Sequence, residues 1–183
     1  MYKMKYLLIF SIIMWGVFFY TQAKADTSKE FAYEIKNCVD KLYNEIPLEE
    51  QIPIELIIAQ AAHESAWGKS RFAVEGNNLF GIRTWDLTEP HMKAKLRPNA
   101  SWGLKVYNNW CHSVTHYLHI INTVSAYKQL RIELAYQREI GIITPINLAL
   151  YLEDWSEQGP EYVRLIQSIM LSLYKKEFFN QLT

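Results

Sequence analysis

The sequence lacks an excess of charge of either sign. Its 183 residues hold 19 lysines and arginines and 19 aspartates and glutamates, so the formal net charge is zero. Residues 1–25 contain three lysines and no acid, which leaves 16 basic against 19 acidic residues and about −3 for the remainder. Because nucleic-acid-binding domains carry a basic patch or stripe, this balance argues against a nucleic-acid partner.

The chain also lacks internal repeats and low-complexity segments. Half of its residues are hydrophobic and 14% are aromatic, so a domain of this length can bury a sizeable core. We therefore expect a single domain over residues 26–183, acting as a monomer.

The amino-terminal apolar run is short for a membrane span. Tyr6 to Tyr20 is largely apolar, whereas a spanning helix needs about 18–20 apolar residues. Lys3 and Lys5 precede the run, and Ala23-Lys24-Ala25 follows it as a small-x-small cleavage site. This order predicts a signal peptide over residues 1–25, with an uncleaved anchor as the alternative. We expect an exported protein of the periplasm or cell envelope, or a secreted one, without a stable membrane span after cleavage.

Cysteine is scarce, with only Cys38 and Cys111. Each lies on or near the inward side of a predicted helix. In an oxidising compartment the two can pair, and closing a loop of this length would add about 4 kcal/mol in the chain-entropy model. We expect two buried free thiols, with a disulfide as the alternative.

One stretch, Pro53 to Gly68, is strongly patterned. Pro53 suits a first helical position because it lacks the N–H that would be unpaired there. Glu55 places a negative charge in the first turn, which the helix dipole favours. The three alanines of Ala59 to Ala62 are strong helix formers, and Gly68 supplies a stop. We predict a helix of about four turns.

This helix places Glu64 at the edge of an apolar face. At 100° per residue, Ile57 and Glu64 lie almost above one another beside the core-facing stripe, and Gln60 sits next to them. A carboxyl there is partly desolvated, which raises its pKa and suits a general acid near neutral pH. An ion-paired structural glutamate is the alternative. The solvent side carries Leu56, His63 and Trp67, so we expect a second surface or a ligand to cover the two apolar ones.

Two blocks of this region resemble a known signature. They are Ala59-Gln60-Ala61-Ala62-His63-Glu64-Ser65-Ala66-Trp67-Gly68-Lys69-Ser70 and Asn78-Leu79-Phe80-Gly81-Ile82. In this order and at this separation they resemble the peptidoglycan N-acetylglucosaminidase domain of glycoside hydrolase family 73, of flagellar FlgJ-type muramidases and of Bax-like proteins. The resemblance covers roughly residues 46–178 and implies that Glu64 is the catalytic acid.

The chain between Leu79 and Tyr107 has a different pattern from the rest. Leu79 to Trp85, Lys93 to Arg97 and Trp102 to Tyr107 are strand-like. We therefore predict a mainly α (α+β) fold, a lysozyme-like helical domain with a small β-hairpin or three-stranded lobe flanking the cleft. The predicted helices besides the Glu64 helix are 27–44, 110–122, 125–140, 144–154 and 161–178.

A second carboxylate is expected from this lobe if the mechanism needs one. Thr88-Glu89 before Lys93-Ala94-Lys95-Leu96-Arg97 is similar to the family's Thr-x-Glu hairpin, which makes Glu89 a candidate. The hairpin is shorter than in the family and Leu96 stands where the family has Phe, so Asp86 is a second candidate. A solvated turn is the alternative for both, and the substrate's own acetamido group is the alternative to a second acid.

A third block lies near the carboxyl end. Trp155-Ser156-Glu157-Gln158-Gly159-Pro160-Glu161-Tyr162-Val163 resembles the Bax-like Y-S-E-x-G-x-x-Y-V block. Tyr162 matches its second aromatic residue. Trp155 replaces its first tyrosine, which keeps a stacking surface for a sugar and loses the phenolic hydroxyl. Core packing is the alternative role of both.

These observations predict a peptidoglycan hydrolase that cleaves the β-1,4 bond after N-acetylglucosamine without a cofactor. The alternatives are a lysozyme or lytic transglycosylase, whose Gly-Leu-Met-Gln block is missing here, and a wall-binding module that has lost catalysis. His112, His116 and His119 have metal-ligand spacing, but the resemblance implies no metal there. The residues expected to line the sugar groove are Gln60, Trp67, Asn78, Phe80, Trp155 and Tyr162.

Overall fold

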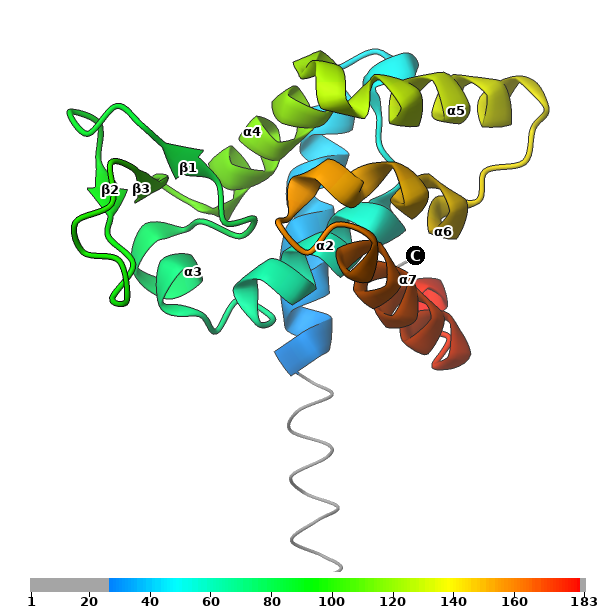
Figure 1. The fold of residues 1–183 in the computed structure, drawn as a ribbon. Helices are drawn as coiled ribbons and strands as arrows, with labels where there is room; N and C mark the ends of the chain where they lie inside the picture. Colours follow the sequence, from blue (N-terminus) through cyan, green and yellow to red (C-terminus); the bar gives the residue numbers. More distant parts are fainter. Residues whose placement is uncertain (1–26, 182–183) are drawn as a thin grey trace, which may run out of the picture.

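The computed structural model describes residues 27–181, so the predicted signal peptide lies outside the described residues (Figure 1). Helices dominate this part of the chain, and none of those within residues 27–181 has both the length and the hydropathy to cross a bilayer. In chain order they are helical residues 27–43, η1 (Leu48–Glu50), α2 (Ile54–Ser65), α3 (Arg71–Gly76), α4 (Trp110–Thr123), η2 (Ser125–Tyr127), α5 (Lys128–Glu139), α6 (Pro145–Leu148), η3 (Ala149–Trp155), α7 (Pro160–Lys175) and η4 (Phe179–Gln181).

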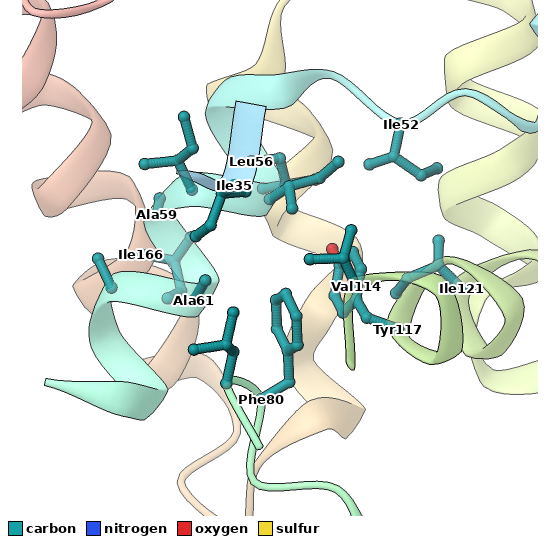
Figure 2. Packing of buried hydrophobic residues seen from close by; sticks show 14 of the residues in the cluster. Ile35, Ile52, Leu56, Ala59, Ala61, Phe80, Val114, Tyr117, Ile121 and Ile166 are labelled. Atoms are coloured by element: carbon teal, nitrogen blue, oxygen red, sulfur yellow. The ribbon is translucent and has the colours of Figure 1, made fainter. Parts of the chain in front are cut away.

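Helix α2 lies in the interior, where the other helices enclose it (Figures 1 and 2). All residues from Leu56 to Ala62 are buried, and α7 packs against α2 and η3. The side of α2 that carries Leu56 is therefore covered by other helices, and the expectation that a second surface covers Leu56 is confirmed. Figure 2 shows Leu56 next to Ile35 of helical residues 27–43.

The end of α2 is set by three consecutive residues in the left-handed region. Ala66, Trp67 and Gly68 have φ of 51°, 58° and 75°, so the helix stops at Ser65, before the glycine that was predicted to end it. The Trp67 N–H donates to the Ala62 carbonyl over 2.9 Å, which satisfies one of the free carbonyls of the last turn. A Cβ on Gly68 would lie 2.7 Å from the Trp110 ring, so this turn requires glycine.

The β lobe is a small antiparallel sheet to one side of the helices, drawn in green in Figure 1. It contains β1 (Arg83–Thr84), β2 (His91–Met92) and β3 (Gly103–Lys105) in the order β1-β3-β2. The predicted mainly α architecture with a small lobe is confirmed. The strand predicted at Lys93 to Arg97 is wrong, because the Lys93 ammonium donates to the carbonyls of Ala100 and Trp102 and closes a loop there.

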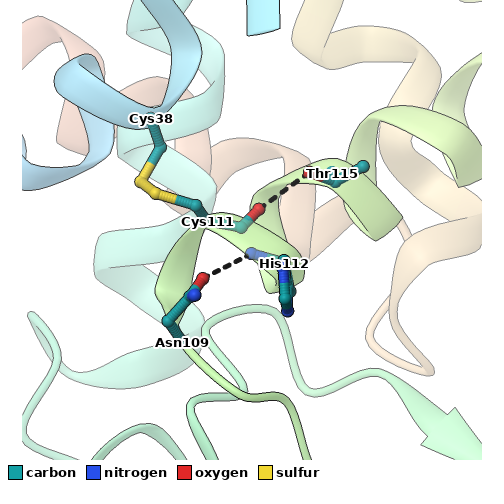
Figure 3. Close-up of a disulfide and its surroundings, with 5 residues drawn as sticks. All are labelled: Cys38, Asn109, Cys111, His112 and Thr115. Atoms are coloured by element: carbon teal, nitrogen blue, oxygen red, sulfur yellow. Dashed lines mark hydrogen bonds between the residues drawn. A yellow bond between two sulfur atoms is a disulfide. The ribbon is translucent and has the colours of Figure 1, made fainter. Parts of the chain in front are cut away.

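Two helix predictions in the second half need correction. The helix expected over residues 144–154 is divided into α6 and the 3₁₀ segment η3, with Tyr151 outside helical geometry (φ −95°, ψ 16°). The last helix ends at Lys175 and not at Phe178. Asn109 caps α4, since its side chain accepts from the His112 N–H over 3.0 Å (Figure 3).

Cys38 and Cys111 form a disulfide (Figure 3). The prediction of two free thiols is therefore wrong, because helical residues 27–43 pass close to the first turn of α4 and bring the two Cα atoms to 5.1 Å. The bond joins two helices through cysteines that are 73 residues apart in the sequence.

Candidate active site

A pocket of about 800 Å³ opens between the β lobe and the η3–α7 connection. Glu64, at the carboxyl end of α2, contributes to its lining. The remaining lining residues come from the loop after α3, from β1, and from the segments around η2 and η3. They are Phe80, Gly81, Ile82, Arg83, Trp85, Ile120, Tyr127, Glu153, Asp154, Trp155, Ser156, Glu157, Gln158 and Gly159.

The environment of Glu64 favours its neutral form. Burial raises the pKa of this carboxyl, while hydrogen bonds from Tyr162 and Trp155 oppose the rise because they stabilise the charged form. A tryptophan side chain can only donate, through its indole N–H. None of the ion pairs found within residues 27–181 involves Glu64. The Glu64 carboxyl is therefore protonated more readily than an exposed glutamate.

Gln60 is not among the residues that line the pocket. It lies one turn before Glu64, is fully buried, and bonds through both ends of its amide. The Tyr117 hydroxyl donates to its oxygen over 2.5 Å, and its nitrogen donates to the Tyr162 hydroxyl over 2.9 Å. Gln60 and Tyr162 thus form the layer behind Glu64, and Tyr162 is not among the lining residues.

The loop after α3 brings the backbone against Glu64. Gly81 has φ of +65°, and a Cβ there would lie 3.3 Å from Glu64 Oε2. Asn78 is buried and shapes this loop, since its side chain accepts from the Ile82 N–H over 3.0 Å and donates to the Ile82 carbonyl over 2.8 Å. Asn78 is not among the lining residues. Phe80 lines the pocket, and its ring stacks on Tyr117 at 4.3 Å between centroids.

The two predicted tryptophans have different surroundings. Trp67 packs edge-on against Phe31 at 5.8 Å and lies outside the pocket lining. Trp155 lines the pocket, and its ring contacts Tyr117 and Tyr127 at 5.3 and 5.8 Å.

Neither lobe carboxylate is among the lining residues. Asp86 is fully exposed, and hydrogen bonds from the Thr88 hydroxyl and N–H lower its pKa. Glu89 forms an ion pair with Lys105 at 2.7 Å. The carboxylates that do line the pocket are Glu153, Asp154 and Glu157.

Sequence reasoning did not identify these three carboxylates or two residues of the lobe wall. Arg83 of β1 lies 3.4 Å from Glu157 on the facing segment. Trp85 follows β1 and keeps 65% of its surface exposed while lining the pocket. The adjacency of the acids to Trp155, already a candidate, is the signal that would have found them.

The three histidines do not form a metal centre. Within residues 27–181 no group of three or more histidine, cysteine, aspartate or glutamate side chains is arranged to hold a metal ion. His116 Nδ1 instead lies 2.7 Å from the Tyr107 hydroxyl.

Comparison with known proteins gives three similarities. A family model described as mannosyl-glycoprotein endo-beta-N-acetylglucosaminidase matches residues 40–175. Protein bax of Escherichia coli (strain K12) is 31% identical over 115 residues, which cover 61% of this chain and 39% of that protein, so the chain spans about two fifths of this relative's length. A C-terminally truncated glycoside hydrolase domain of FlgJ from Salmonella typhimurium has a similar fold, with a TM-score of 0.55 at 20% identity over 81% of this chain and 98% of that one.

Proposed function

Because this chain belongs to the glucosaminidase family of glycoside hydrolases, we propose that it cleaves the β-1,4 bond after N-acetylglucosamine in peptidoglycan, with Glu64 as general acid. The observation that carries this proposal is the half-buried Glu64 carboxyl at the pocket. Its pKa is raised by burial, and its hydrogen-bond donors are both neutral side chains. A structural glutamate would instead be expected to face a lysine or an arginine.

In the proposed reaction, neutral Glu64 gives its proton to the oxygen that leaves as the glycosidic bond breaks. Positive charge then develops on the sugar ring and has to be met from the opposite side. The substrate's acetamido oxygen can attack the ring carbon, after which water completes hydrolysis. Alternatively, a carboxylate activates water directly.

The residues that line the pocket favour assistance by the acetamido group, or catalysis by a carboxylate of η3. They do not favour a carboxylate of the β lobe. Glu89 is paired with Lys105, and Asp86 bonds to Thr88, so both carboxylates are engaged outside the lining. For either to act, the lobe would have to close on the bound glycan. Glu153 and Asp154 already line the pocket.

The walls of the pocket fit a glycan strand. Its volume of about 800 Å³ lies in the range of ligand pockets. Trp85 and Trp155 offer aromatic faces to sugar rings. Arg83 on one wall and the acids on the other offer charged partners to the peptide stems of peptidoglycan. The signal-like residues 1–25 and the disulfide support export of the protein. Export would place the enzyme with this substrate.

The test is a digest of purified peptidoglycan by the wild type and by Glu64→Gln, with the products identified by mass. We expect free reducing N-acetylglucosamine ends from the wild type and none from the variant. Reducing or anhydro muramic ends would instead identify a lysozyme or a lytic transglycosylase. Binding to the polymer without turnover by the wild type would identify a wall-binding module.

A further inference from the structure

A chain of buried hydrogen bonds runs from α4 through α2 to α7 and ends at Glu64. Tyr117 donates to the amide oxygen of Gln60 over 2.5 Å, and the amide nitrogen donates to the Tyr162 hydroxyl over 2.9 Å. The Tyr162 hydroxyl in turn interacts with the Glu64 carboxyl, which lowers the pKa of Glu64 and raises that of Tyr162. Tyr117 and Gln60 are fully buried and are not among the lining residues, so a bound glycan does not reach them.

The direction of this hydrogen-bond chain follows from the orientation of the Gln60 amide, whose oxygen faces Tyr117 and whose nitrogen faces Tyr162. A tyrosine hydroxyl has one proton and an amide has a donor end and an acceptor end. Tyr117 gives its proton to the Gln60 oxygen, so the amide presents its N–H side to Tyr162. Because the Tyr162 oxygen accepts that N–H, its own proton is left for Glu64.

The opposite orientation of the Gln60 amide would reverse the last link. With the amide oxygen toward Tyr162, the tyrosine would give its proton to Gln60 and offer a lone pair to Glu64. Neutral Glu64 would then donate its proton to Tyr162, into the protein, and the proton would be withheld from the pocket.

We propose that Gln60 and Tyr117 are positioning residues, which hold the Tyr162 hydroxyl as a donor to Glu64 and so keep the acid's proton directed to the substrate. The inference rests on the proposed role of Glu64 as general acid. It also accounts for an amide on the most enclosed part of α2, where the other residues from Leu56 to Ala62 are apolar. A buried amide is costly unless both of its ends are bonded, as they are here.

Two variants interrupt this series of hydrogen bonds at different links. Tyr117→Phe removes the first proton and keeps the ring that stacks on Phe80 at 4.3 Å. Gln60→Met keeps the length of the side chain and removes both amide ends. The matched control is Tyr107→Phe, which removes another buried hydroxyl, bonded to His116 over 2.7 Å and outside the pocket lining.

The first readout is the kinetics of peptidoglycan hydrolysis at neutral pH. One net hydrogen bond corresponds to roughly a three- to tenfold change in rate. We expect kcat to fall about three- to tenfold in both variants with KM within about twofold of wild type, because the lost interaction acts on the acid and not on glycan binding. Tyr107→Phe is expected to match the wild type in both constants.

The second readout is the titration of the Glu64 carboxyl by ¹³C NMR, with its resonance assigned by its loss in Glu64→Gln. In Gln60→Met the Tyr162 oxygen is free to accept the proton of neutral Glu64, so the pKa of Glu64 should rise above the wild-type value. Tyr117→Phe should raise it less, and Tyr107→Phe not at all. The other ionisable groups near Glu64 and Tyr162 stay the same in these proteins, namely His63, Arg83, Tyr127, Glu153, Asp154 and Glu157.

The two proposals fail in different ways. An unchanged titration together with unchanged kcat in Gln60→Met and Tyr117→Phe overturns the positioning role, even where Glu64→Gln is inactive. A fully active Glu64→Gln protein overturns the proposed function, while the titration still reports on the hydrogen-bond chain. If Gln60→Met does not fold, Tyr117→Phe decides by both readouts.

Discussion

The Trp155 side chain lies close enough to Glu64 to lower the pKa of its carboxyl, against the effect of burial. The residue that stands where the resembling Bax-like block has a tyrosine therefore still supplies a donor, through an indole N–H in place of a hydroxyl. The substitution keeps both an aromatic face in the pocket and a polar contact to the proposed acid.

Removing this donor should shift the pH profile of the enzyme, whereas replacing it by another donor should not. In Trp155→Phe the Glu64 carboxylate loses one hydrogen bond, so its pKa should rise and the alkaline limb of the kcat/KM profile should move to higher pH. The general acid works when protonated, so activity falls as pH rises through that pKa. We expect Trp155→Tyr to keep the wild-type limb, and identical profiles for wild type and Trp155→Phe would contradict the contact.

Glu64→Gln should abolish most of the activity and stabilise the fold. General acid catalysis contributes about 10²–10⁴-fold, so at least this loss of kcat is expected.

The same substitution should stabilise the fold. Burial raises the folded-state pKa of Glu64. The stability that its neutral form contributes is therefore present below the unfolded-state pKa and is lost as pH rises through the folded-state pKa. Glutamine cannot ionise. The free energy of unfolding of Glu64→Gln, measured in urea, should therefore exceed that of the wild type by more at pH 7 than at pH 4. Equal free energies of unfolding at pH 7 would contradict the description of Glu64 as a buried acid.

The stereochemistry of the product distinguishes the two routes for the second step. Assistance by the acetamido group retains the anomeric configuration, whereas direct attack by activated water inverts it. We expect retention, read by proton NMR of a short chitooligosaccharide digest at early times. With retention, Glu153→Gln, Asp154→Asn, Asp86→Asn and Glu89→Gln should each keep kcat within about tenfold of wild type.

Inversion would require one of these carboxylates to act as the base. In that case one substitution should lower kcat by about 10²-fold or more. A loss in Asp154→Asn or Glu153→Gln would place the base on the η3 wall, whereas a loss in Glu89→Gln or Asp86→Asn would show that the lobe closes on the substrate.

The disulfide should contribute to stability and not to chemistry. It closes a loop across 73 residues, for which the chain-entropy model gives about 4 kcal/mol. Cys38→Ser/Cys111→Ser is expected to lose roughly this free energy of unfolding in urea and to keep its kcat at 25 °C where it remains folded. Treatment of the wild type with reductant should reproduce the loss, and equal midpoints with and without reductant would show that the bond contributes nothing.

Much of the fold was predictable because local signals and tertiary packing agree. The alanines and the terminal residues around α2, for example, all act within one helix. The strand predicted at Lys93 to Arg97 failed because alternation of basic and apolar residues does not report where Lys93 finds its carbonyl partners, seven and nine residues away.

The sequence by itself determined the helical elements, the position of a glutamate at the end of one of them, and the family signature, because these depend on near neighbours along the chain. Only the tertiary structure decided that Leu56 and Gln60 are enclosed, that Cys38 meets Cys111, and that Trp155 and Tyr162 interact with Glu64. Helical periodicity separates the faces of a helix, but it does not say how many neighbours cover them. Contacts between residues 73 or 102 positions apart depend on how the helices cross.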